Sequence, residues 1–172
     1  MMSTLSLAAF LCCFAATLCL DLERMCRFSN GMIVNDVCFY IPRQEGSFEE
    51  AVAYCERDGG VLAYPESDEE FEIMKAVSKS SCSKCEVQTG LIHDNWCIFV
   101  SYDNKMKLHW DSPWWQNGAG LHDYSYDDCE YWNQGVISVI RTTYWEPELI
   151  AEFMDEYASG KTFICKLRKE QL

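Results

Sequence analysis

The sequence has few basic residues and few histidines, and both shortages exclude classes of function. The formal net charge is −13, because 27 acidic residues outnumber 14 lysines and arginines. A chain this acidic is repelled by nucleic acid and by anionic membrane surfaces, so we exclude both as partners. The only histidines are His93, His109 and His122, and the chain contains no HExxH motif, GxSxG motif or phosphate-binding loop. We expect a protein that is not an enzyme, with a secreted hydrolase as a remote alternative.

Long apolar runs are also scarce. The sequence has one at its amino terminus and no second one downstream. Residues 1–20 carry no charged side chain, and the run over residues 5–20 includes small residues. An apolar run shorter than about 18 residues favours a cleaved secretory signal over a membrane anchor, which is the minority interpretation. We expect a signal peptide over residues 1–19, secretion to the extracellular space, and no membrane insertion once the signal is removed.

Cysteine, in contrast, is abundant, with 11 residues in the chain. Three of these lie in the expected signal peptide, and an even number of eight remains in the mature chain. An even number of cysteines behind an export signal indicates disulfide bonds formed in an oxidising compartment. The eight are Cys26, Cys38, Cys55, Cys82, Cys85, Cys97, Cys129 and Cys165. At roughly 150 residues the mature chain makes one domain, whose bridges reinforce a real core.

Two amphipathic helices are predicted by their start signals. Ser47 precedes Glu50 by three residues, which is the spacing of a capping box, and Gly59-Gly60 supplies a stop. The apolar stripe of this first helix ends on Cys55, so that cysteine faces inward. Ser67 and Glu70 repeat the capping pattern and open a second helix that continues to about Ser80.

The remainder of the chain favours short strands. Residues 31–46 are rich in branched and aromatic side chains between turn formers, which predicts two strands. Residues 87–143 show no helical period and alternate short strand-like runs with polar, glycine-rich turns. PELIAEFMDEY, residues 147–157, is interpreted as a short helix with an acidic outer face. KTFICKL, residues 161–167, is interpreted as a last strand that finishes on Cys165.

In the order of these cysteines, helices and strands, the sequence resembles the C-type lectin-like domain over residues 26–168. The resemblance depends on the order of several segments rather than on any single one. They are Cys26 and Cys38 with the following Phe39-Tyr40, SFEEAVAYCERDGGVLA (47–63), ESDEEFEIM (66–74), TGL (89–91), LHWD (108–111) and FICK (163–166). It implies an α+β fold in which two helices pack on short antiparallel sheets, with a long irregular loop region.

The resemblance also implies disulfide pairings, and at one conserved bridge the chain departs from the family. In that family the cysteine of the first helix is bonded to the cysteine of the last strand, which implies Cys55 with Cys165, and the amino-terminal pair implies Cys26 with Cys38. The second conserved bridge of the family is missing in its usual form, because no cysteine lies between Cys129 and Cys165. The remaining four cysteines allow three pairings among themselves. A bridge from Cys82 to Cys85 closes a very small loop, so each is expected to reach Cys97 or Cys129.

The Ca²⁺ motifs of the sugar-binding family members are altered. Those members hold Ca²⁺ with Glu-Pro-Asn or Gln-Pro-Asp in the long loop and Trp-Asn-Asp in the next strand, since Ca²⁺ requires oxygen ligands. Here the loop proline is flanked by Ser112 and Trp114, and the second triplet is matched by Trp145-Glu146-Pro147. We predict that this site is absent or remodelled and that the protein needs no cofactor. The rival prediction is a nonstandard Ca²⁺ site, with candidate ligands Asp123, Asp127, Asp128, Glu130 and Glu146.

The candidate ligand-binding residues are Trp114, Trp115, Gln116 and Asn117. Exposed aromatic rings stack on sugars and dominate many protein interfaces, whereas buried ones only fill the core. We expect a secreted recognition module that binds carbohydrate without the usual Ca²⁺ site. The alternative is a module that binds an extracellular protein in defence, adhesion or gamete recognition and binds no sugar. The sequence leaves the identity of the ligand and the oligomeric state open.

Overall fold

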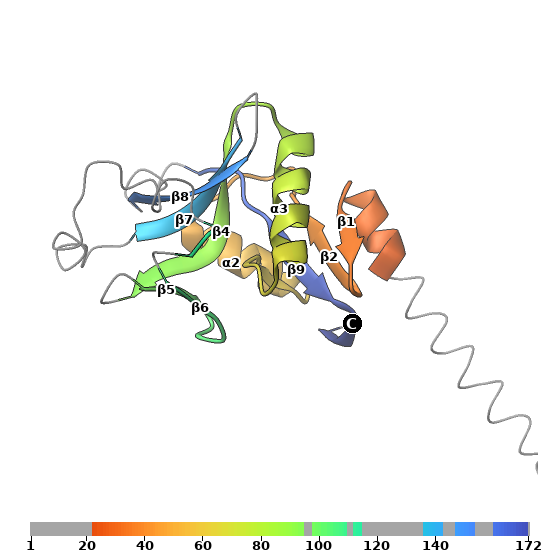
Figure 1. The fold of residues 1–172 in the computed structure, drawn as a ribbon. Helices are drawn as coiled ribbons and strands as arrows, with labels where there is room; N and C mark the ends of the chain where they lie inside the picture. Colours follow the sequence, from red (N-terminus) through yellow and green to blue (C-terminus); the bar gives the residue numbers. More distant parts are fainter. Residues whose placement is uncertain are drawn as a thin grey trace, which may run out of the picture.

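The computed structural model describes residues 22–94, 98–109, 112–114, 136–142, 147–153 and 160–171, and it has the α+β class expected from the sequence (Figure 1). The helices are a short one over residues 22–28, α2 (Phe48–Arg57), α3 (Asp68–Ser81) and the 3₁₀ turn η3 (Lys169–Gln171). The predicted signal peptide, residues 1–19, lies outside the described residues. Among the described residues, no helix is long and apolar enough to span a membrane.

Two antiparallel sheets form the centre of the molecule. The first has the order β1 (Met32–Val34), β2 (Val37–Tyr40), β9 (Cys165–Arg168) and β3 (Val61–Leu62). The second has the order β6 (Lys107–His109), β5 (Ile98–Ser101), β4 (Glu86–Asp94), β7 (Val136–Arg141) and β8 (Glu148–Phe153). A parallel bridge between Gln88 and Phe163 links β4 to the segment that leads into β9. The last strand therefore connects the two sheets.

The helix starts confirm the predicted caps. The Ser47 hydroxyl accepts a hydrogen bond from the Glu50 amide at 3.3 Å, and the Glu50 carboxylate accepts one from the Ser47 amide at 2.9 Å. Gly59, with φ of 82°, follows the end of α2. At Gly60 a Cβ atom would lie 2.5 Å from the Lys166 carbonyl oxygen of β9, so the chain approaches the last strand too closely for any side chain.

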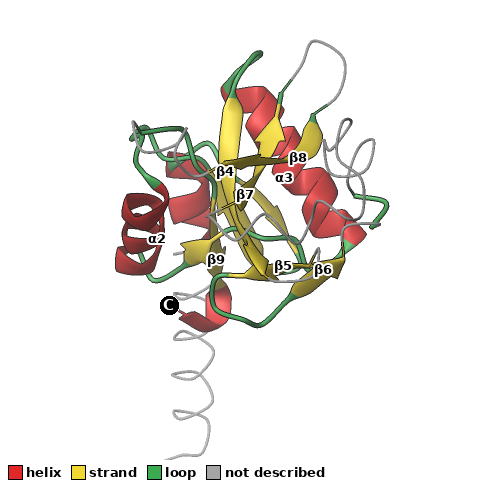
Figure 2. Ribbon diagram, turned by 90° about the vertical axis from the view of Figure 1, so that its left-hand side faces the viewer, coloured by secondary structure: helices red, strands yellow, loops and turns green. Residues whose placement is uncertain are grey.

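The strands lie between the two helices (Figure 2). Their buried side chains divide between two cores, one that includes residues of α3 and one that includes residues of α2. Phe39, Ile140 and Ile164 belong to the core that includes Phe71, Met74 and Val77 of α3. Cys38, Val139 and Phe163 belong to the core that includes Phe48, Ala51 and Cys55 of α2. Because successive side chains of a strand point to opposite faces, one apolar run fills both cores.

Three elements differ from the sequence-based expectations. Residues 148–153 form strand β8 rather than a helix, since Leu149 and Ile150 pair with Ile140 and Val139 of β7 and are buried on opposite faces. The last strand begins at Cys165 and continues to Arg168, instead of finishing on Cys165. The helix over residues 22–28 was not predicted, and its Leu22 is buried in the core beside α2.

Candidate functional site

Two disulfide bonds hold the frame on which any ligand site must be built. Cys26 is bonded to Cys38 and Cys55 to Cys165, with Cα–Cα distances of 5.8 and 5.5 Å, as the resemblance implies. All four side chains are buried. The second bond joins α2 directly to β9, and the two residues are 110 positions apart in the sequence. It therefore closes almost the whole described domain into one covalent loop.

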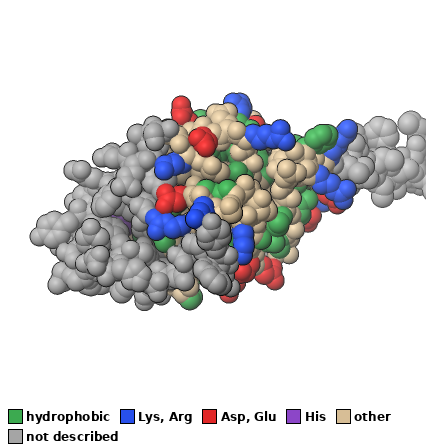
Figure 3. All heavy atoms as spheres, turned by 90° about the horizontal axis from the view of Figure 1, so that it is seen from above, with side chains coloured by type: hydrophobic (Ala, Val, Ile, Leu, Met, Phe, Trp, Pro, Cys, Tyr) green, Lys and Arg blue, Asp and Glu red, His purple; other side chains and the backbone are tan. Residues whose placement is uncertain are grey.

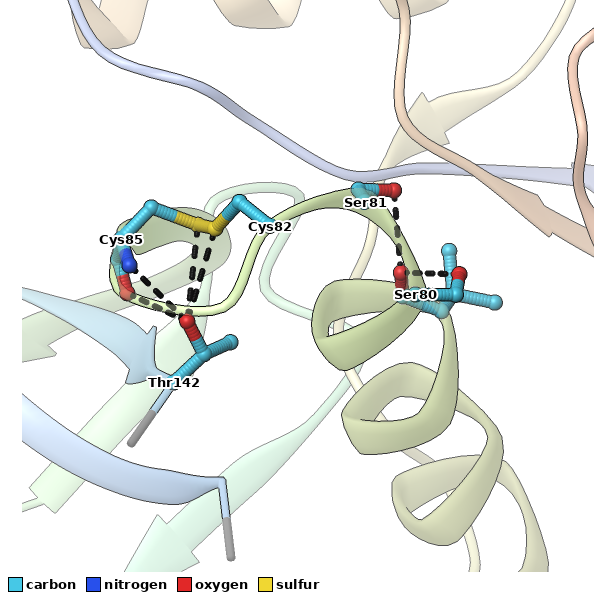
Figure 4. Close-up of a disulfide and its surroundings, with 6 residues drawn as sticks. Ser80, Ser81, Cys82, Cys85 and Thr142 are labelled. Carbon is cyan, nitrogen blue, oxygen red and sulfur yellow. Dashed lines mark hydrogen bonds between the residues drawn. A yellow bond between two sulfur atoms is a disulfide. The ribbon is translucent and has the colours of Figure 1, made fainter. Parts of the chain in front are cut away.

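The third disulfide corrects the pairing expected from the sequence. Cys82 is bonded to Cys85, with a Cα–Cα distance of 6.0 Å, rather than to Cys97 or Cys129, which lie outside the described residues. Cys82 ends α3 in an extended conformation, so the chain turns and brings Cys85 back at the start of β4. The Thr142 hydroxyl accepts a hydrogen bond from the Cys85 amide at 2.9 Å and lies 3.4 Å from the Cys82 sulfur (Figure 4). Both sulfurs serve here to fix the turn between α3 and β4.

Trp114 is the one predicted ligand-binding residue that the described part of the chain contains, and it is attached to α3. Its ring stacks on Phe71 with centroids 5.4 Å apart, and its indole nitrogen donates a hydrogen bond to Asp68 at 2.6 Å. The ring is only half-buried, but one face is covered by Phe71. Trp114 thus anchors residues 112–114 to the first turns of α3. Trp115, Gln116 and Asn117 lie outside the described residues.

The predicted metal ligands cannot be placed, because Asp127, Asp128 and Glu146 lie outside the described residues, as do Asp123 and Glu130. Within the ranges that are described, no group of three His, Cys, Asp or Glu side chains could hold a metal ion. His93 lies on β4 with its ring edge against Phe99, at a centroid distance of 5.5 Å. His122 also lies outside the described residues.

A buried lysine holds the first sheet against the start of α3. Lys166 of β9 is 0% exposed, and its ammonium group donates hydrogen bonds to Glu70 at 2.7 Å and to Glu66 at 3.0 Å. The same ammonium group lies 5.1 Å from the ring centroid of Tyr64. Burial alone would raise the pKa of Glu66, but hydrogen bonds from Lys166 and Arg168 lower it below the ordinary value. This cluster was missed from the sequence.

A second polar cluster fixes the turn between β5 and β6. Asp103 accepts hydrogen bonds from the Tyr64 hydroxyl at 3.0 Å and from the Ser101 hydroxyl at 2.6 Å, and Lys105 pairs with it at 2.8 Å. Burial alone would raise the pKa of Asp103, but these three partners lower it from 3.8 to about 2. The Tyr64 pKa is raised, first by burial and then by the hydrogen bond to Asp103. The cluster ties the turn to the residue that follows β3.

The lowered pKa of Asp103 predicts a loss of stability in acid. A carboxyl group with a depressed folded-state pKa stabilises the fold above its ordinary pKa of 3.8, and this contribution is lost as the pH falls toward about 2. Asp103→Asn is expected to lower the free energy of unfolding at neutral pH by about 2 kcal/mol and to flatten its decline between pH 4 and 2. Urea unfolding across the pH range measures both effects. The exposed Asp36→Asn is the control, and an equal change there would contradict the assignment to Asp103.

The comparisons agree on one fold. No protein-family model matches the sequence, and no curated protein matches it. The structure is similar to the trimeric Kupffer cell C-type lectin receptor Clec4f, with a TM-score of 0.61, 17% identity and coverage of 94% of this chain and 95% of that one. It is also similar to the C-type lectin domain of murine dendritic cell inhibitory receptor 2 in complex with N-glycan, with a TM-score of 0.59, 12% identity and coverage of 80% and 95%.

A further match is EMS16, an antagonist of collagen receptor integrin α2β1, with a TM-score of 0.52, 15% identity and coverage of 80% of this chain and 96% of that one. These proteins are similar in overall structure to this chain at identities of 12–17%. At identities below 25%, structural similarity shows the fold alone. The protein has the C-type lectin-like fold.

Proposed function

We propose that the protein is a secreted recognition module that binds carbohydrate without turnover and without the Ca²⁺ site usual in this fold. The observation that supports the absence of the Ca²⁺ site most directly is the arrangement of residues 112–114. At the place of the Ca²⁺ triplet the chain offers Ser112 and Trp114 around Pro113, and Trp114 is held by Phe71 and Asp68. Since Ca²⁺ requires several oxygen ligands, an indole ring fixed on α3 cannot supply them.

Carbohydrate is the ligand class that the fold favours. The domain of murine dendritic cell inhibitory receptor 2, which this chain resembles in fold, was solved in complex with N-glycan. Lys166 and Asp103 are both engaged in pairs that hold elements of the fold together, so we assign structural roles to both.

A glycan array probed with the secreted protein tests this proposal. We expect binding to at least one glycan class, with the same signal when EDTA replaces Ca²⁺ in the buffer. Loss of the signal in EDTA would show that a Ca²⁺ site exists and would contradict the Ca²⁺-free proposal. An array without any signal would contradict carbohydrate binding itself.

A protein ligand is the second candidate, and exposed apolar side chains favour it. Met25, Phe28 and Ile33 are 38%, 79% and 40% exposed, and all three lie in the first described segment of the chain. EMS16, which has the same fold, is described as an integrin antagonist. This candidate would be favoured if the secreted protein retains a protein partner from an extracellular extract and shows no binding on the glycan array.

A further inference from the structure

A pocket of about 640 Å³ lies at the carboxyl end of α3, away from the residues predicted to bind a ligand. Its walls come from the helix over residues 22–28, the segment after β2, α2 and the last residues of α3. A pocket of this volume is within the range of roughly 300–1,000 Å³ that is usual for small-ligand sites. Trp114 contacts the first turns of α3, whereas Ser80 and Ser81 of the pocket are near its end. Because α3 has 14 residues, the two places are about 20 Å apart along the helix.

Three aromatic side chains line this pocket. Phe28 is 79% exposed, which makes it the most exposed large apolar side chain of the described residues. Its position follows from the sharp turn after the helix over residues 22–28. At Gly31 a Cβ atom would lie 2.6 Å from the Phe39 carbonyl oxygen and 2.8 Å from the Cys26 sulfur, so this turn needs glycine. Tyr40 and Tyr54 contribute the other two rings.

Polar groups with fixed directions lie beside these rings. The Tyr40 hydroxyl donates a hydrogen bond to Asp58 at 3.1 Å, and burial followed by the nearby Asp58 charge raises the Tyr40 pKa, so this hydroxyl stays protonated. The Ser80 and Ser81 hydroxyls donate to the Val77 carbonyl oxygen at 2.8 and 3.0 Å, which leaves their oxygen lone pairs as acceptors. Arg43 and Asn30 add donors to the lining.

The charge around this end of the molecule differs from the strongly acidic average of the chain. Figure 3 looks onto the end where α3 finishes and shows Lys and Arg side chains alongside Asp and Glu. The charged residues that line the pocket are Arg43, Glu45 and Asp58. A neutral polyhydroxyl compound suits this mixture, because its hydroxyl groups both donate and accept hydrogen bonds and its C–H faces pack on aromatic rings.

We propose that this pocket is the saccharide-binding site of the protein, with a sugar ring packed on Phe28 and sugar hydroxyl groups bound to the Asp58 carboxylate without a metal ion. This inference rests on the proposed carbohydrate binding and assigns it a place. Asp58 is the hydrogen-bond acceptor that Tyr40 orients, and its side chain keeps 29% exposure. The Ser80 and Ser81 hydroxyls, which also line the pocket, provide further acceptors.

The test measures the affinity of the secreted protein for a glycan found on the array, in EDTA buffer, for three variants. Phe28→Ala removes an exposed ring, and we expect about a tenfold loss of affinity with little change in thermal stability. Asp58→Asn keeps the shape of the side chain and removes its charge, and a comparable loss is expected. Ile33→Ala is the matched control, since Ile33 is 40% exposed and does not line the pocket. Its affinity should stay within twofold of the unaltered protein.

The outcomes separate the place of the site from the proposed function. Unchanged affinity in both Phe28→Ala and Asp58→Asn, with glycan binding intact, would overturn this pocket and leave carbohydrate binding standing. A fourth variant, Trp115→Ala, is measured in the same way, and a loss in this variant alone would overturn the pocket and move the site to the segment predicted from the sequence. If the unaltered protein binds no glycan, the proposed function and this inference fall together. An equal loss in Ile33→Ala would show that the effect is not specific to the pocket, and it would also overturn the assignment.

Discussion

Replacing Lys166 by methionine is expected to lower the free energy of unfolding by about 3–5 kcal/mol. The Lys166 side chain is 1% exposed and pairs with Glu70, whose own side chain is 8% exposed. Without the ammonium group, the Glu70 carboxylate stays buried beside Glu66 with no cation between them. Such an unpaired buried charge costs far more than the loss of an exposed ion pair. Chemical denaturation followed by tryptophan fluorescence measures the change.

Two further variants identify the cause of this loss. Arg168→Met removes the other partner of Glu66, but that arginine side chain is 36% exposed, so a loss below about 1 kcal/mol is expected. The double variant Lys166→Met/Glu70→Leu removes both buried charges and should recover most of the stability. A double variant as unstable as Lys166→Met alone would contradict the unpaired-charge explanation. It would indicate that the lysine acts through packing on Phe39 and Tyr64 instead.

Replacing Cys55 and Cys165 together by alanine is expected to lower the free energy of unfolding by about 5 kcal/mol. The disulfide joins residues 110 positions apart, so its removal frees a large loop in the unfolded chain. Closing a loop of four residues is worth about 2 kcal/mol in the same treatment, so the pair Cys82→Ala/Cys85→Ala should cost less than half as much.

Urea unfolding of the two double variants against the unaltered protein gives this comparison. Each variant replaces two disulfide-bonded cysteines by alanine, so the number of deleted atoms is the same. Equal losses, or a larger loss for the Cys82–Cys85 pair, would contradict the view that the covalent link between α2 and β9 is the main constraint on the fold.

The elements that the sequence predicted well are those set by local chemistry. Ser47 and Glu50 form the capping box within three residues of each other, and Cys55 follows from the helical period of one apolar stripe. The pairing of Cys55 with Cys165 required the resemblance to a known fold, because cysteine counts alone leave the partners open. Helix ends and apolar periodicity are therefore readable from neighbouring residues, whereas covalent partners are not.

The elements that were wrong depend on partners far away in the sequence. Residues 148–153 include glutamate, leucine and alanine, which suit a helix, but pairing with β7 places Leu149 and Ile150 on opposite faces of a sheet. The Cys82–Cys85 bond was judged unfavourable from loop size, yet Thr142, nearly sixty residues away, holds the turn that brings the two together. Tertiary contacts override local preference in both cases.

The candidate site also has a part that the sequence indicated and parts that depend on distant partners. A signal for Lys166 was present, because it lies two residues after the buried Ile164 in an extended segment and therefore shares its face. Trp114 was selected as an aromatic residue, but no pattern in the sequence indicated that Phe71 and Asp68 of α3 would hold it. The pocket beside Phe28 brings together residues from five separate segments, and no local pattern in the sequence connects them.

The most direct test of the proposed Ca²⁺-free carbohydrate recognition is the dissociation constant of the purified protein for one array-selected glycan, measured first in EDTA and then in excess Ca²⁺. We predict equal values in the two buffers, because no calcium ion takes part in the contact between sugar and protein. Binding that appears only when Ca²⁺ is added would contradict the account.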